Sequence, residues 1–213
     1  MLEAVTQQEP DFTPRQRAVL AAALDLLVEK GERALTTAGI ARHASCSKES
    51  LYKWFGDRDG ILAAVISFQA SKVKPRAGTG LRTELSVYRS DLIAFALDLL
   101  TVLHGNVSLA LNRLAISQAS RDDFRLGETL LERGRNPIRA RARSLIEIGV
   151  RSGHLNVADL DAATRTFYGL IVGDAHVSLL LGASKGPTED DLAHIAEQAV
   201  SHFFKLFLRS NTL

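Results

Sequence analysis

The chain has 213 residues, 46% of them hydrophobic and 23% charged, with a formal net charge of +2. This composition argues for a folded globular protein, and the small net charge excludes a protein whose whole surface coats nucleic acid or membrane. Any nucleic-acid surface must therefore be local. The single cysteine, Cys46, excludes an intramolecular disulfide and a cysteine-based zinc site.

The N-terminal stretch MLEAVTQQEPDFTP lacks the basic start and apolar core of a secretory signal. No run approaches eighteen uninterrupted apolar residues, and the most apolar neighbourhood, residues 170–181, contains glycine, aspartate, histidine and serine. We therefore expect a cytoplasmic protein with no membrane partner, no metal site and no cofactor.

Apolar residues recur at helical spacing after the first thirteen residues, without convincing two-residue alternation, so an all-α fold is predicted. The starts of helices are marked by Thr13 before a proline, by Thr36, by Ser47, and by Thr188 in capping-box spacing with Asp191. With a break at 134–136, helices are expected at about residues 14–31, 36–44, 47–55, 58–73, 81–103, 107–119, 122–134, 137–153, 159–181 and 188–209.

Residues 36–55, TTAGIARHASCSKESLYKWF, are predicted to form two short helices joined by a tight turn. The inward side would hold Ala41 at the crossing together with Ile40, Ala44, Cys46, Leu51 and Phe55. This is the arrangement of a helix-turn-helix, in which an apolar seam fixes the pair and the second helix is free to enter a major groove. The outward side carries residue types that bond phosphate or base edges: Ser47, Lys48, Ser50, Tyr52, Lys53 and Trp54.

Positive charge is concentrated in the same segment. Residues 33–54 contain four Lys or Arg and one acid, Glu49, a local balance of +3 in a chain whose total is only +2. A solvated helix face would explain any one of these side chains, but the ordered combination favours a DNA-binding surface.

Residues 14 to about 66 resemble the N-terminal DNA-binding domain of the TetR family of transcriptional regulators. The matching pattern is T-x-x-x-I-A-x-x-A from Thr36, S-K-x-S-L-Y-x-W-F from Ser47 and D-R-D-x-I-L from Asp57. The segment AGTG at residues 77–80 indicates a junction between this part and a larger remainder. The resemblance implies a flexible N-terminal arm at 1–13, a helix-turn-helix domain at 14–58, a connecting helix at 59–75, and a helical effector-binding and dimerisation domain at 76–213.

The resemblance also implies roles in DNA recognition. Contacts with phosphate are expected from Thr36, Thr37, Tyr52, Trp54 and Arg58. Base edges would be read by Lys48, Ser50 and Lys53, with a lysine-to-guanine contact foremost. Since one helix covers too little DNA for useful specificity, a homodimer on a palindromic double-stranded DNA operator is expected.

The sequence departs from the family pattern at three positions. Ser45 replaces the usual glycine of the turn, and a left-handed conformation there would cost on the order of 1 kcal/mol. Cys46 replaces a common valine and is interpreted as a small buried hydrophobe, with a redox sensor as the alternative. Glu49 replaces a glycine; its charge suits the start of a helix but opposes phosphate, and it could instead accept from cytosine N4.

The dimer interface is expected in the last two long helices, because the family pairs its final two helices into a four-helix bundle. Gly169 and Gly173 lie four residues apart and would allow close approach of helices. The predicted interface residues are Gly169, Leu170, Gly173, Val177, Leu181, Phe203 and Phe207. The alternative is that these residues fill the core of a single chain.

An effector pocket is expected in the helices between residues 81 and 153, joined by Tyr168. The candidate lining residues are Tyr88, Phe95, His104, Asn112, Arg113, Phe124 and Tyr168. An apolar cavity with one or two polar anchors would suit a small amphipathic or aromatic effector. Taken singly, each is more typical of a structural residue, and a lone histidine such as His104 is usually a satisfied core residue.

The sequence holds no nucleophile elbow, no H-E-x-x-H, no phosphate loop and no carboxylate–histidine spacing for a di-metal bundle, so no catalytic residues are assigned. The predicted function is a ligand-responsive repressor released from its operator by the effector, whose binding would shift the helix ending near Val73. An activator, or a helical interaction protein using the same motif, remains the alternative.

Overall fold

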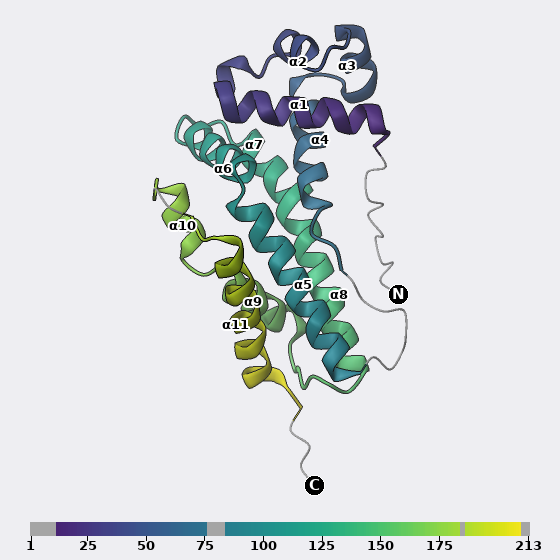
Figure 1. The fold of residues 1–213 in the computed structure, drawn as a ribbon, viewed down its shortest axis with the longest axis vertical. Coiled ribbons are helices and arrows are strands. Elements are labelled where there is room, and N and C mark those ends of the chain that lie inside the picture. The colour runs from purple at the N-terminus through teal and green to yellow at the C-terminus, as the bar shows by residue number, and fades with distance from the viewer. Residues whose placement is uncertain (1–11, 76–83, 184–185, 210–213) are drawn as a thin grey trace. The chain divides into compact units, whose positions relative to one another are not determined.

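The computed structural model describes residues 12–75, 84–183 and 186–209. Within these ranges it contains helices and no strand, so the all-α prediction is confirmed (Figure 1). Contacts among helices divide the chain into two compact units: the N-terminal unit, Met1–Lys72 with Asn106–Pro137, and the C-terminal unit, Val73–Gly105 with Ile138–Leu213.

The N-terminal unit is built around α1, which packs against α2, α4 and α6. Its elements are α1 (Pro14–Lys30), the 3-10 turn η1 (Glu32–Ala34), α2 (Thr37–His43), α3 (Lys48–Phe55), α4 (Arg58–Ala70), α6 (Asn106–Ala119), α7 (Arg125–Thr129) and the π-helical segment η2 (Leu130–Arg135). One side of each helix enters a shared apolar core that includes Val19, Leu20, Ile40, Leu51, Ile61 and Leu111.

The predicted helix starts of this unit are confirmed by their caps. In each case a side-chain oxygen accepts the backbone N–H three residues on: Thr13 from Gln16 at 3.2 Å, Thr36 from Gly39 at 3.0 Å and Ser47 from Ser50 at 3.1 Å. Such caps satisfy N–H groups that have no partner inside the helix. The sequence therefore fixes where α1, α2 and α3 begin.

Phe12 was placed in the flexible arm by the prediction, and that placement is wrong. Its ring lies 6.4 Å from that of Phe55 and 6.3 Å from that of Phe68, and its carbonyl accepts from Arg17 Nε at 2.8 Å. Burial of an aromatic ring against two others holds the residue on the core. The rest of the predicted arm, residues 1–11, lies outside the described residues.

The C-terminal unit consists of α5 (Leu85–His104), most of α8 (Asn136–Arg151), α9 (Leu160–Val172), α10 (Ala175–Leu180) and α11 (Glu189–Phe207). Helix α11 packs against α5 and α9, and α10 packs against α5. A row of aromatic rings runs through this core: Phe95 is stacked on Phe167 at 6.3 Å between ring centroids, and Phe167 lies 4.9 Å from the tilted ring of Phe203. Among the described residues, no single helix is long and apolar enough to cross a membrane.

The break predicted at residues 134–136 is wrong. Asn136 has helical dihedrals, φ −64° and ψ −45°, and its N–H donates to the Leu131 carbonyl five residues back, so α7 passes through the π-helical η2 into α8. A Cβ on Gly134 would lie 3.3 Å from Ile66 of α4. The glycine is therefore explained by close packing within the N-terminal unit and not by a helix end.

The single helix predicted at 159–181 is also wrong. Helix α9 ends at Val172, where Gly173 adopts φ 52° and donates its N–H to the Gly169 carbonyl at 3.0 Å. A left-handed glycine of this kind terminates a helix. Gly173 therefore separates α9 from α10, and the spacing of Gly169 and Gly173 reflects a C-cap.

Candidate nucleic-acid interface

The hinge between α2 and α3 is a tight turn centred on Ser45. Ser45 adopts φ 49°, in the left-handed region, and the Cys46 N–H donates to the Ala41 carbonyl at 2.9 Å. Ile40 of α2 and Leu51 of α3 are both fully buried, so an apolar seam lies beneath the turn. The predicted helix-turn-helix is present, including the strained conformation expected of a serine at this position.

Arg15 of α1 clamps this turn from outside. Its Nη2 atom donates to the carbonyls of Ser45 at 2.7 Å and Ala44 at 3.3 Å. These carbonyls follow the last turn of α2 and need donors from elsewhere. The sequence interpretation missed Arg15, because the two contacts join residues about thirty positions apart and follow no local pattern.

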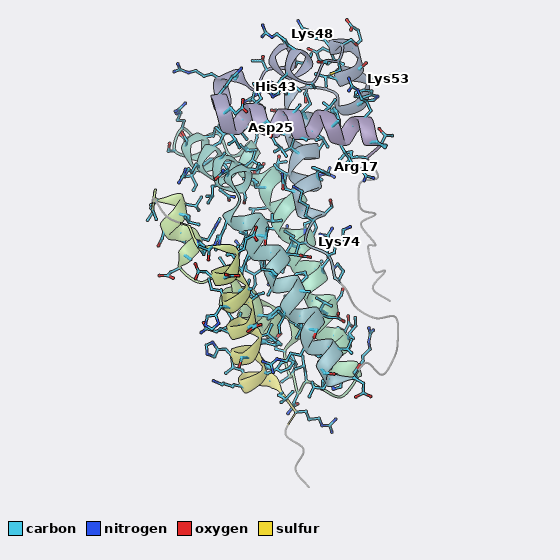
Figure 2. All side chains as sticks on the ribbon, viewed as in Figure 1. Arg17, Asp25, His43, Lys48, Lys53 and Lys74 are labelled. Carbon is cyan, nitrogen blue, oxygen red and sulfur yellow. The ribbon has the colours of Figure 1, made fainter. Side chains whose placement is uncertain are left out.

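The outward face of α3 carries its cationic and aromatic side chains. Lys48, Tyr52 and Lys53 are exposed, Tyr52 to 55%, while Leu51 between them is buried. Figure 2 shows Lys48 and Lys53 at the α2–α3 end of the N-terminal unit. A helix of eight residues is about 12 Å long, close to the width of a B-DNA major groove.

Other predicted DNA-binding side chains also have structural contacts. The Ser47 hydroxyl caps α3 and lies 3.1 Å from the Ser50 hydroxyl, and the Thr36 hydroxyl caps α2. Trp54 is half-buried against the core, its ring edge-on to Phe55 at 6.2 Å. Thr37 is half-buried at the first position of α2. Their contacts with DNA remain predictions, as do base reading by the exposed Lys48 and Lys53 and a phosphate contact by the exposed Tyr52.

Arg58 positions the start of α2. Its Nε atom donates to the Leu35 carbonyl at 3.0 Å, directly before the N-cap Thr36. The neighbouring Gly60 is required because a Cβ there would collide with the Phe55 carbonyl at the end of α3. The start of α4 thus braces both helices of the pair, and a phosphate contact by Arg58 remains a prediction.

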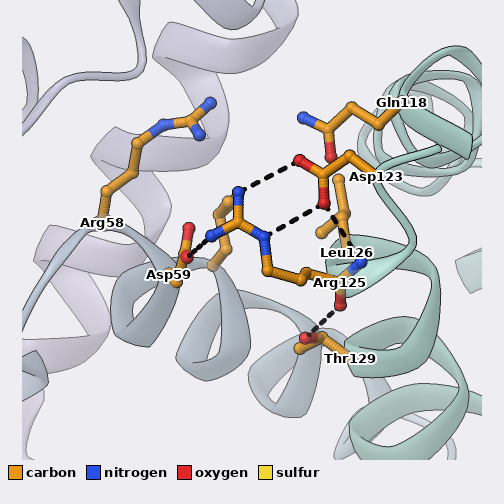
Figure 3. A pocket seen from close by; sticks show the side chains of 8 residues that line it. Arg58, Asp59, Gln118, Asp123, Arg125, Leu126 and Thr129 are labelled. Carbon is orange, nitrogen blue, oxygen red and sulfur yellow. Dashed lines mark hydrogen bonds and ion pairs between the residues drawn. The ribbon is translucent and has the colours of Figure 1, made fainter. Parts of the chain in front are cut away.

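A polar pocket lies beside Arg58 within the N-terminal unit (Figure 3). Its central group is Arg125, which binds Asp123 through Nε and Nη2 at 3.0 and 3.1 Å and reaches Asp59 of α4 through Nη1 at 3.4 Å. Hydrogen bonding to the Arg125 guanidinium lowers the pKa of the Asp123 carboxyl, and the Asp123 carboxylate in turn raises the pKa of Arg125. Arg125 therefore joins α4 to the α6–α7 turn, a role that sequence reasoning missed.

Glu49 remains an anion at the start of the recognition helix. Its own backbone N–H, the Ser47 hydroxyl and the Lys48 charge lower the pKa of its carboxyl. A carboxylate among these first N–H groups suits the helix dipole, as expected. The charge also disfavours a phosphate close to this position.

The predicted effector-pocket residues divide between the two units. Asn112, Arg113 and Phe124 lie in the N-terminal unit, and Phe124 is 54% exposed. The remaining four lie in the C-terminal unit: Tyr88, Phe95, His104 and Tyr168.

Two members of the second group belong to the core of that unit. Phe95 is stacked on Phe167, and the Tyr88 hydroxyl donates to the Leu145 carbonyl at 3.2 Å. Burial raises the pKa of Tyr88 far above its ordinary value. These two side chains therefore support the unit from within, and the expectation that the seven line one pocket stays a prediction.

The predicted dimer residues also differ in exposure. Val177 and Leu181 on and after α10 are 53% and 85% exposed, whereas Phe203 is fully buried among rings of its own chain. Phe203 was therefore wrongly placed on a surface, because both α9 and α11 turn apolar sides toward one core. Gly169 is exposed, and Leu170 and Phe207 are half-buried.

These features, an apolar seam, a clamped turn and an exposed basic second helix, define a helix-turn-helix DNA-binding protein. A family model described as "Bacterial regulatory proteins, tetR family" matches residues 19–65, and one described as "AefR-like transcriptional repressor, C-terminal domain" matches residues 90–208. The chain belongs to the TetR family of transcriptional regulators, as its sequence motif predicted, and this is not a family of enzymes.

Relatives span nearly the whole chain. A TetR transcriptional regulator from Agrobacterium tumefaciens, known from its crystal structure, is 57% identical, with a TM-score of 0.81 over 93% of this chain and 97% of the other. YdeS of Bacillus subtilis, an uncharacterized HTH-type transcriptional regulator, is 29% identical over 80% of this chain and 88% of its own. A regulator structure from Mesorhizobium loti, 22% identical over 92% of this chain and 97% of its own, shares the fold with a TM-score of 0.72.

Proposed function

We propose that this protein is a ligand-responsive transcriptional repressor that binds a palindromic operator as a homodimer and is released by a small amphipathic or aromatic effector. The observation that carries the DNA-binding part is the exposed cationic face of α3 above a fully buried Leu51. The description of the family model over residues 90–208 as that of a repressor domain supports the sign of regulation. An activator is the alternative.

Homodimerisation is supported by large apolar side chains that are exposed in the described part of the chain. Val177, Leu181 and Leu206 are 53%, 85% and 61% exposed in the C-terminal unit. Water contact with large aliphatic side chains is unfavourable, and a second copy would remove it. Two copies would also present two α3 helices to two half-sites, which provides specificity that one short helix lacks.

Effector binding is proposed in the C-terminal unit, which forms a compact core of its own and holds most of the residues that the repressor-domain model matches. An effector that binds one arrangement of the helices better than another would shift the conformational equilibrium. The chain passes from the N-terminal unit into this unit at Lys72–Val73, just after α4. A cytoplasmic location belongs to the same proposal, since a regulator must share a compartment with its operator.

The test begins with selection of binding sites from a library of random DNA duplexes, followed by anisotropy titration at one stated salt concentration. We expect an inverted repeat. Lys53→Ala should weaken binding to it about 5- to 150-fold, the effect of losing a base contact of about 1–3 kcal/mol. Lys205→Ala, at an exposed position on α11, is the matched control and should change little. A selected site without two-fold symmetry would refute the dimer, and an unchanged Lys53→Ala affinity would refute the assigned reader.

The sign of regulation needs a second measurement. A promoter containing the selected site, placed before a reporter gene, should be less active when the protein is present. Higher activity with the protein would replace the repressor by the activator.

A further inference from the structure

Two histidines of the C-terminal unit form a half-buried pair. His104 lies in the last turn of α5 and His176 near the start of α10, and their ring centroids are 6.1 Å apart with an interplanar angle of 21°. Both side chains are half-buried. The pair brings together residues far apart in sequence, and His176 was not among the residues predicted for the pocket.

Three ring nitrogens of this pair lack hydrogen-bond partners among the described residues. They are both nitrogens of His104 and the Nδ1 atom of His176, and all three are shielded from solvent. His176 has a hydrogen bond to the Leu103 backbone through its other side. Buried polar atoms are almost always hydrogen-bonded, so an imidazole with both nitrogens unpartnered needs an explanation. His104 is thus not the satisfied core histidine expected from sequence.

The environment of the two histidines favours the neutral form of both imidazoles. Burial lowers the pKa of both imidazoles, and the proximity of His176 lowers that of His104 further. A neutral imidazole offers one N–H donor and one bare nitrogen acceptor. A hydroxyl group, which also donates once and accepts, complements this combination, whereas a buried carboxylate would bring an uncompensated charge.

A metal ion is a poorer fit. Among the described residues, no third histidine, cysteine or acid joins the pair in a group that could hold a metal. Flat parallel rings instead match a planar aromatic ligand, which can lie against an imidazole face.

We propose that His104 and His176 bind the hydroxyl group of a neutral aromatic ligand of the phenol class. This inference rests on the proposed function, because the ligand would be the effector of the C-terminal unit. It narrows the effector from an amphipathic or aromatic molecule to one whose polar group both donates and accepts a hydrogen bond.

The test uses the full chain without DNA and three probes of matched shape: 4-propylphenol, 4-propylanisole and 4-propylbenzoate. Isothermal titration calorimetry should show that 4-propylphenol binds at least tenfold more tightly than either of the other probes, because 4-propylanisole cannot donate a hydrogen bond and 4-propylbenzoate is charged. In protein with ¹⁵N-labelled histidine, the phenol should shift the ring resonances of His104 and His176. Failure of the phenol to bind, or tighter binding of the benzoate, would overturn the proposal.

Variants separate this site from a general apolar cavity. His104→Phe keeps a flat ring and should remove the preference for phenol over anisole without lowering stability to urea, since it removes two unpartnered polar atoms. His176→Gln keeps an N–H for the Leu103 carbonyl but removes Nδ1, and should reduce the preference even if His104→Phe does not fold. His202→Phe, at an exposed position on α11, is the control.

Retention of the full preference in both His104→Phe and His176→Gln would refute the site. Because no DNA is present, these results are independent of operator binding. If the protein recognises an operator but does not bind the phenol, only the ligand-site proposal is refuted. If the phenol binds in a histidine-dependent way but no operator is recognised, the ligand site stands and the proposed regulatory function is refuted.

Discussion

Replacing Ser45 by glycine should stabilise the N-terminal unit. Ser45 adopts φ 49° in the turn before α3, a region that costs a residue with a Cβ about 1–2 kcal/mol and costs glycine almost nothing. Glycine also increases the freedom of the unfolded chain, which offsets about 0.4–1 kcal/mol of this gain. The expected net increase in the free energy of unfolding is about 0.5–1 kcal/mol, or about 1–4 °C in melting temperature for a chain of this length.

The assay is urea unfolding followed by tryptophan fluorescence. Trp54 is the single tryptophan of the chain and packs against the core of the N-terminal unit, so the signal reports on the unit that carries the change. Ala44→Gly is the matched control, because Ala44 has φ −86° and should lose stability with glycine. If Ser45→Gly proved as destabilising as Ala44→Gly, the strain assigned to this turn would be refuted.

Three further predictions concern contacts that the sequence did not reveal or only suggested. Arg15→Ala should speed amide hydrogen exchange in the α2–α3 turn about fivefold, because loss of two guanidinium hydrogen bonds at an exposed site is worth about 1 kcal/mol; unchanged exchange would contradict the clamp. Gly149→Ala should destabilise the C-terminal unit by about 1–3 kcal/mol, because its Cβ would collide with the Tyr88 ring; urea unfolding followed by circular dichroism measures the loss. Tyr88→Leu in the Gly149→Ala background should recover part of the lost stability. No recovery would contradict the collision with Tyr88. The backbone N–H and the hydroxyl of Thr188 lower the pKa of Asp191 below its usual 3.8. This cap therefore stabilises α11 above pH 3.8, and the stabilisation is lost as the pH falls through the lower pKa of the folded state. A carboxyl ¹³C titration should show the lowered pKa, and Thr188→Ala should raise it only part of the way to 3.8, because alanine keeps the backbone N–H; an unchanged pKa would contradict the role of the hydroxyl.

Local patterns predicted the elements well wherever a side chain close in sequence determines the backbone. Thr13, Thr36 and Ser47 cap the helices they were expected to start, since a cap needs only an N–H three residues away. The same holds for Thr188, whose capping box with Asp191 begins α11. The family motif lies in this locally determined part of the chain.

Predictions failed where one residue type has two uses. Gly173 and Gly134 were interpreted as a packing residue and a helix end, and the structure reverses both: the first ends α9 and the second packs against Ile66. Glycine suits either use because it lacks a Cβ, and only the neighbouring helix decides between them. Phe203 likewise could not be assigned to the core or to the surface from apolar spacing alone, because only the neighbouring helices decide whether its ring is covered.

The sequence by itself determined the family, the all-α fold and the exposed basic second helix of the helix-turn-helix, because these depend on residues three or four positions apart along the chain. Tertiary structure alone decided that Arg15 clamps the turn, that Arg125 joins α4 to the α6–α7 turn, and that His104 meets His176. Hydrogen bonds and ring contacts act over a few ångströms, so partners separated by 30, 66 or 72 positions become visible only when folding places them together.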